Sequence, residues 1–206
     1  MIVLFLGSSL TKYAEEYDDE ILHYIRAIKF KFEYKYYSGK SFEYMVRNPH
    51  LIDRALECNP DFIIVIFGAN SISTKVQQKN VLDSCRDFYS ILHEKSMNRN
   101  HNIKIIASEC PMRYVYDNNH NTPVPQDFWK FRRYLNKKIG GLKSKHYTLR
   151  LSGDERLELK SCYSDGVHFS ARGLKIFFEQ TIKCLQYILD KENLSYQTQL
   201  SYPYHY

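Results

Sequence analysis

The chain has 206 residues, of which 44% are hydrophobic and 25% are charged, and this length and composition are typical of one soluble globular domain. The formal charge is +6, from 29 Lys and Arg against 23 Asp and Glu. That mildly basic balance is compatible with an acidic partner such as RNA or a phosphate headgroup, but it does not require one.

The cysteines give no sign of a metal site or of a disulfide framework. There are five of them, widely spaced and without a CxxC pair, so we expect a reducing compartment. The first apolar run is short, has no basic flank before it and meets no small-residue cleavage site, unlike a signal peptide. No apolar run approaches the ~20 residues of a membrane span. We therefore expect a cytoplasmic protein without a transmembrane segment.

The N-terminal part of the chain predicts two strands and two helices. Residues 2–6 are continuously apolar, as in a parallel strand that is buried on both faces. Helical apolar spacing follows over 13–28. Residues 32–37 alternate with period two, which favours a strand near the sheet edge. A second helix is expected over 42–56, with an interruption at Asn48-Pro49.

The middle of the chain carries its most apolar run, residues 62–67, which we expect to be the central strand. Gly68-Ala69-Asn70-Ser71 stands at the carboxyl end of this strand. A helix over about 75–96 and a strand over 103–107 complete this part of the pattern.

The C-terminal part begins with the longest irregular stretch, residues 110–126, whose length is common for binding loops. A helix over 128–139, a short strand over 147–151 and a last helix through about residue 189 follow. Residues 191–206 form a polar, tyrosine-rich tail that we expect to be poorly ordered.

Strands and helices thus alternate about five times along the chain. This order predicts an α/β fold, a three-layer α/β/α sandwich around a mainly parallel five-stranded sheet with right-handed crossovers. We expect a single domain over residues 1–190. In such sheets ligands bind at the carboxyl ends of the strands, so the residues that follow each strand are the candidates for chemistry.

Four loops at those strand ends carry a set of groups suited to acyl transfer. Ser9 can act as a nucleophile, with His168 as its base and Asp165 as the carboxylate that orients the imidazole. The backbone N–H groups of Ser9 and Gly39 and the side-chain amide of Asn70 can form an oxyanion hole. Seen alone, the Ser8-Ser9 pair is more typical of a helix cap.

These residues resemble the motif blocks of the SGNH hydrolases, also called GDSL-type lipases and esterases. The first block matches Gly7-Ser8-Ser9-Leu10, the second matches Gly39, the third matches Gly68-Ala69-Asn70-Ser71 and the last matches Asp165-Gly166-Val167-His168. The resemblance implies a flavodoxin-like SGNH fold, a Ser9-His168-Asp165 triad and an oxyanion hole of Ser9, Gly39 and Asn70.

Two positions depart from the family pattern. Ser8 replaces the aspartate of the first block, and Ser71 replaces the aspartate of the third block. Neither position belongs to the triad. We expect both serines to orient loops by hydrogen bonds around the site.

The leading hypothesis is an acyl or acetyl esterase that needs no metal and no organic cofactor. The resemblance implies small ester substrates such as acetylated sugars, short-chain esters or lysophospholipid-like molecules. The alternative is an SGNH-fold module that binds RNA, protein or a lipid surface; a retroelement-derived esterase-like domain is one form that this alternative can take. The basic residues between Lys130 and Lys145 keep nucleic-acid binding open but are more typical of a solvated helix face.

Overall fold

The computed structural model describes residues 1–17, 30–73, 78–114, 126–144, 146–151 and 155–192. Five strands form one sheet in the order β2-β1-β3-β4-β5, and every neighbouring pair is parallel. The strands are β1 (Ile2–Gly7), β2 (Lys31–Tyr36), β3 (Phe62–Ile66), β4 (Lys104–Ser108) and β5 (Tyr147–Leu149). The predicted five-stranded α/β architecture is confirmed.

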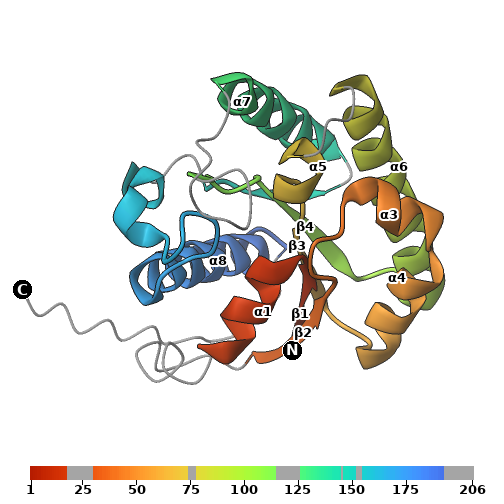
Figure 1. Cartoon of the computed structure of the whole chain (residues 1–206). Helices are drawn as coiled ribbons and strands as arrows, with labels where there is room; N and C mark the ends of the chain where they lie inside the picture. The colour runs from red at the N-terminus through yellow and green to blue at the C-terminus, as the bar shows by residue number, and fades with distance from the viewer. Residues whose placement is uncertain (18–29, 74–77, 115–125, 145, 152–154, 193–206) are drawn as a thin grey trace, which may run out of the picture.

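Helices precede or follow the strands in alternation (Figure 1). They are α1 (Ser9–Glu16), α3 (Phe42–Arg47), α4 (His50–Ala55), α5 (Ala69–Ser73), α6 (Gln78–Arg99), α7 (Gln126–Gly140) and α8 (Ala171–Lys191). Short 3-10 turns follow α4 and α7, and two more lie between β5 and α8.

The helices cover both faces of the sheet, which gives the three expected layers (Figure 1). Alternate side chains of β1 point to opposite faces, as the pleat of a strand requires. Leu4 and Leu6 pack with α3, α4, α6 and α7, whereas Val3 and Phe5 pack with α1 and α8. Two apolar cores therefore sandwich the sheet.

Burial explains the strand order. Every residue of β3 is buried, and β1 is buried except at Ile2, so these strands need protein on both faces and occupy the middle of the sheet. In β2 every residue is exposed or only partly buried. The period-two pattern correctly predicted an edge strand there.

Several predicted boundaries shift in the structure. The first helix begins at Ser9 rather than at residue 13, because Leu10, Thr11 and Ala14 already form its buried face; the rest of its predicted range, 18–28, lies outside the described residues. The break at Asn48-Pro49 is real and separates α3 from α4. Helix α5 was not predicted, because a helix of only five residues is too short to show a helical period in its sequence.

Two other expectations fall on residues outside the described part of the chain. The first concerns the irregular stretch 110–126, in which residues 115–125 are not described. The second concerns the tail, which is not described from residue 193 onward. The expected domain extent stays a prediction. Within the described ranges, no helix has the length and apolar character needed to cross a membrane.

Candidate active site

Three loops leave the same edge of the sheet beside one another. Gly7, the last residue of β1, is in register with Tyr36 of β2 and Ile66 of β3. Backbone bonds extend this pairing past the strands, since Tyr37 N donates to Gly7 O at 2.8 Å and Ser8 N donates to Ile66 O at 3.2 Å. The register therefore gathers the first three motif blocks at the carboxyl ends of three neighbouring strands, β2, β1 and β3.

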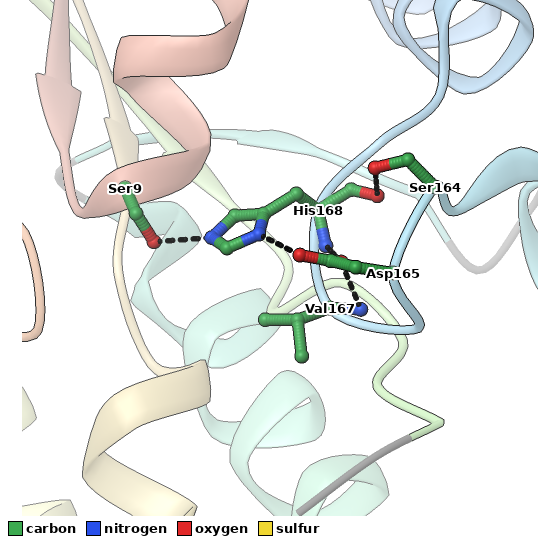
Figure 2. Close-up of polar contacts among 5 residues, drawn as sticks. All are labelled: Ser9, Ser164, Asp165, Val167 and His168. Carbon is green, nitrogen blue, oxygen red and sulfur yellow. Dashed lines mark hydrogen bonds and ion pairs between the residues drawn. The ribbon is translucent and has the colours of Figure 1, made fainter. Parts of the chain in front are cut away.

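Ser9 is the first residue of α1, and Ser8 precedes it in an extended conformation. Ser8 occupies the N-cap position of α1, as the helix-cap interpretation expects, but its buried side chain makes no capping hydrogen bond to the helix. The Ser9 hydroxyl instead points to another part of the chain. Its Oγ lies 2.9 Å from Nε2 of His168 (Figure 2).

His168 is held from its other side by Asp165. The imidazole Nδ1 lies 2.6 Å from Asp165 Oδ2, while Oδ1 accepts hydrogen bonds from the backbone N–H of Val167 at 2.8 Å and of His168 at 2.7 Å (Figure 2). The carboxylate thus closes a tight turn and contacts the ring at the same time. Ser9, His168 and Asp165 form one continuous hydrogen-bonded chain.

The loop that carries Asp165 and His168 is anchored at both ends. Tyr163 and Phe169 form an antiparallel bridge, and Ser164 N donates to His168 O at 2.9 Å. Tyr114 N donates to Gly166 O at 2.6 Å, which ties the tip of the loop to the segment after β4. The acid and the imidazole therefore sit on a short, braced turn.

Opposing effects act on the pKa of Asp165. Burial raises the pKa, but hydrogen bonds from the backbone N–H groups of His168 and Val167 and from the His168 ring outweigh burial. The net result is a pKa below the ordinary value for aspartate, so the carboxylate is ionised at neutral pH and accepts from the imidazole.

The residues expected in an oxyanion hole lie on the two neighbouring loops. Gly39 has φ of 71°, in the left-handed region, and lies in the exposed turn that leads to α3. Asn70 lies in α5, and its Nδ2 donates to Lys40 O at 3.3 Å. The second and third motif blocks therefore touch.

Ser71 links these same two loops. Its Oγ accepts a buried hydrogen bond of 3.0 Å from the backbone N–H of Phe42, the first residue of α3. Such an N–H has no partner inside its own helix. Ser71, which stands where the resembled SGNH motif has an aspartate, thus orients a loop next to the candidate site.

Sequence reasoning missed one residue beside the imidazole, Tyr13. Its ring stacks on the ring of His168, with centroids 4.3 Å apart and planes inclined by 15°. Tyr13 follows Ser9 by four positions, which places the two side chains on one face of α1. That spacing was the available signal, but the predicted start of the helix at residue 13 concealed it.

Other features of the described residues lie away from this site. A groove of about 710 Å³ runs between α6, α8, β4 and β5, and none of its lining residues belongs to the Ser9–His168–Asp165 chain. No group of three or more His, Cys, Asp or Glu side chains in the described ranges could hold a metal ion.

The basic stretch on α7 is less basic at the surface than its sequence suggests. Arg132 is 4% exposed, and its Nε donates to the backbone oxygens of Cys110 and Pro111 at 2.8 and 3.1 Å. It braces the segment after β4. Lys130, Arg133, Lys137 and Lys138 are exposed, as a solvated helix face requires.

Comparison by sequence finds no matching family model and no matching curated protein. Comparison by structure finds proteins with a similar fold. A GDSL-like lipase from Bacteroides thetaiotaomicron matches with a TM-score of 0.64 at 12% identity, over 93% of this chain and 88% of the lipase. An acetyl xylan esterase matches with a TM-score of 0.64 at 14% identity, over 90% of this chain and all (100%) of the esterase.

A third neighbour is the psychrotrophic esterase EstA from Pseudoalteromonas, in a form inhibited by monoethylphosphonate. Its TM-score is 0.58 at 16% identity, over 92% of this chain and 98% of the esterase. The chain therefore has the fold of the GDSL-like lipases and esterases, the SGNH hydrolases that its motifs resemble.

Proposed function

We propose that this chain is a serine-dependent ester hydrolase with Ser9 as nucleophile, His168 as general base and acid, and Asp165 as the orienting carboxylate. The observation that carries the proposal is the hydrogen-bonded chain from Ser9 Oγ to His168 Nε2 at 2.9 Å and from His168 Nδ1 to Asp165 Oδ2 at 2.6 Å. A serine hydroxyl is a weak nucleophile unless a base within hydrogen-bond reach can accept its proton.

In the first half of the reaction, Nε2 of His168 accepts the Ser9 proton while Oγ attacks the ester carbonyl carbon. The carbonyl oxygen becomes an oxyanion. The N–H groups of Ser9 and Gly39 and the amide of Asn70 stabilise this charge, and loss of one such donor typically costs ~3 kcal/mol of barrier. Collapse breaks the ester C–O bond, and the imidazolium gives its proton to the leaving alcohol.

In the second half, His168 accepts a proton from water as the water oxygen attacks the acyl carbon. The tetrahedral intermediate expels Ser9 Oγ, which recovers its proton from the imidazolium. The products are one alcohol and one carboxylic acid, and the enzyme returns to its starting state. Asp165 is ionised throughout and stabilises the imidazolium at Nδ1.

For the substrate we propose small or short-acyl esters, such as acetylated sugars or short-chain esters. Support comes from a neighbour that is itself an acetyl xylan esterase. A separate feature of this region is a group of aromatic side chains next to the loop that carries Asp165. Tyr114 contacts Trp129 and Tyr163 edge-on, with ring centroids 5.8 and 5.3 Å apart. These rings support the loop.

The test is reaction with a fluorophosphonate probe and with p-nitrophenyl acetate, butyrate, octanoate and palmitate. We expect stoichiometric labelling, and the highest kcat/KM on acetate or butyrate. Ser9→Ala should abolish both labelling and turnover. Ser90→Ala, at an exposed serine of α6, is the matched control and should leave both unchanged.

Labelling that survives Ser9→Ala would remove Ser9 from the nucleophile role. A preference for palmitate would overturn the proposed substrate class but leave the hydrolase mechanism standing.

A further inference from the structure

The ring of Tyr13 covers one face of the imidazole of His168 in a nearly parallel stack, with centroids 4.3 Å apart. The contact comes from the same helix that carries Ser9. Because residues four apart lie on one side of a helix, α1 presents to His168 both a hydrogen-bond partner and an aromatic surface.

The packing of α1 on the sheet does not depend on Tyr13. The buried residues of the helix are Leu10, Thr11 and Ala14, whereas Tyr13 is only partly buried. A tyrosine that served only to attach the helix would be expected among the buried residues. We therefore take the stack on His168, and not attachment of the helix, as the main contact of the Tyr13 ring.

The hydrogen bonds of the imidazole constrain the ring within its own plane but only weakly against tilting out of that plane. Both lie at the ring edge, from Nδ1 to Asp165 and from Nε2 to Ser9. Bonds in the ring plane fix where the two nitrogens point but resist a tilt of the plane weakly. An aromatic ring on the face of the imidazole opposes such a tilt.

The stack also matches the charge that His168 acquires during ester hydrolysis. A cation within about 6 Å of the face of a tyrosine ring is attracted by the ring's negative face. The imidazolium meets this condition, and the neutral imidazole gains less from it. The contact is therefore stronger in the transition state than in the free enzyme, which is the requirement for a rate effect.

We propose that Tyr13 is a positioning residue, whose ring holds the plane of the His168 imidazole and stabilises the imidazolium. This inference rests on the proposed function. It assigns the effect to the aromatic ring and gives the hydroxyl no role.

The test compares Tyr13→Leu with Tyr13→Phe on a short-chain p-nitrophenyl ester. Leucine keeps apolar volume and helix propensity but removes the aromatic face. We expect Tyr13→Leu to lower kcat about tenfold with KM changed less than about twofold, a size that a cation–π contact can produce. Tyr13→Phe should stay within about twofold of wild type, as should Tyr134→Leu, a control at an exposed tyrosine of α7.

A kcat for Tyr13→Leu equal to that of wild type would overturn the inference, as would an equal loss in Tyr13→Phe. The ring protons of His168 provide a readout that needs no turnover. The Tyr13 ring current should shift their NMR signals upfield in wild type and Tyr13→Phe, and the shift should disappear in Tyr13→Leu. Absence of Ser9-dependent hydrolysis in wild type would refute the proposed function alone, and absence of the upfield shift would refute the stack.

Discussion

The carboxylate of Asp165 contacts His168 at two places at once, through Oδ1 to the backbone N–H at 2.7 Å and through Oδ2 to the ring Nδ1 at 2.6 Å. One short turn therefore fixes both the backbone and the ring of the same histidine. A carboxylate held by three hydrogen bonds cannot swing away from the imidazole without breaking the turn.

Asp165→Asn should lower kcat/KM for ester hydrolysis about 10³-fold or more. Asparagine can still accept the backbone hydrogen bonds through its oxygen, but it then presents an NH₂ group to Nδ1. That contact favours the tautomer with the proton on Nε2, which cannot accept the Ser9 proton. Steady-state kinetics on a short-chain ester measure the loss. Asp53→Asn, at a surface aspartate paired with Lys95, is the control.

Retention of even half of the wild-type rate by Asp165→Asn would contradict the orienting role. Circular dichroism of both variants should match wild type, which separates a chemical effect from unfolding.

Asp165 should also make stability depend on pH at acid values. Its pKa is lower in the folded chain than in the unfolded chain, where an aspartate has a value of about 3.9. The carboxylate therefore contributes stability that is fully present above pH ~4 and is lost as the pH falls through the folded-state pKa. Urea unfolding of wild type and Asp165→Asn at several pH values tests this.

We expect the stability of wild type to fall more steeply than that of Asp165→Asn below pH ~4. The other carboxylates contribute equally to both proteins, so the difference isolates Asp165. Parallel curves would show that its hydrogen bonds leave no net effect on folding.

Much of the site could be predicted because it depends on strand ends and local spacing. Continuous apolar runs identify β1 and β3 as central strands, and the register of parallel neighbours then brings the residues after them to one edge. Asp165 and His168 are three positions apart, so one turn can join them. These relationships need only periodicity and short-range geometry.

What could not be predicted depends on side-chain packing between distant segments. Arg132 looks like one more surface cation in the sequence, and only its two backbone acceptors after β4 explain its burial. The stack of Tyr13 on His168 requires the true start of α1 and the path of a loop 155 positions later. Charge and periodicity alone do not encode either contact.

Ser71→Ala should destabilise the fold by about 1–3 kcal/mol, because it removes the acceptor for the buried N–H of Phe42. Kinetics should respond too, since this bond ties α5, which carries Asn70, to the segment that follows Gly39. We expect a reduced kcat along with the reduced stability. Urea unfolding and ester kinetics measure the two effects.

Ser90→Ala, on the exposed face of α6, should change neither quantity appreciably. A Ser71→Ala protein as stable and active as this control would mean that the bond to Phe42 is dispensable.

Gly68→Ala should destabilise the fold by about 1–3 kcal/mol, since Gly68 has φ of 121° and an added Cβ would lie 3.2 Å from Cys110 Cβ and 3.3 Å from Leu135 Cδ2. Gly140→Ala is the matched substitution at the end of α7, where an added Cβ meets nothing within 4 Å, and it should stabilise by about 0.4–1 kcal/mol. Urea midpoints with equal m-values would give both differences.

Because Gly68 directly precedes the helix that carries Asn70, Gly68→Ala should also lower kcat, whereas Gly140→Ala should not. Equal stability of the two variants would contradict the strain argument, since they differ in backbone conformation and in the space around the added methyl group.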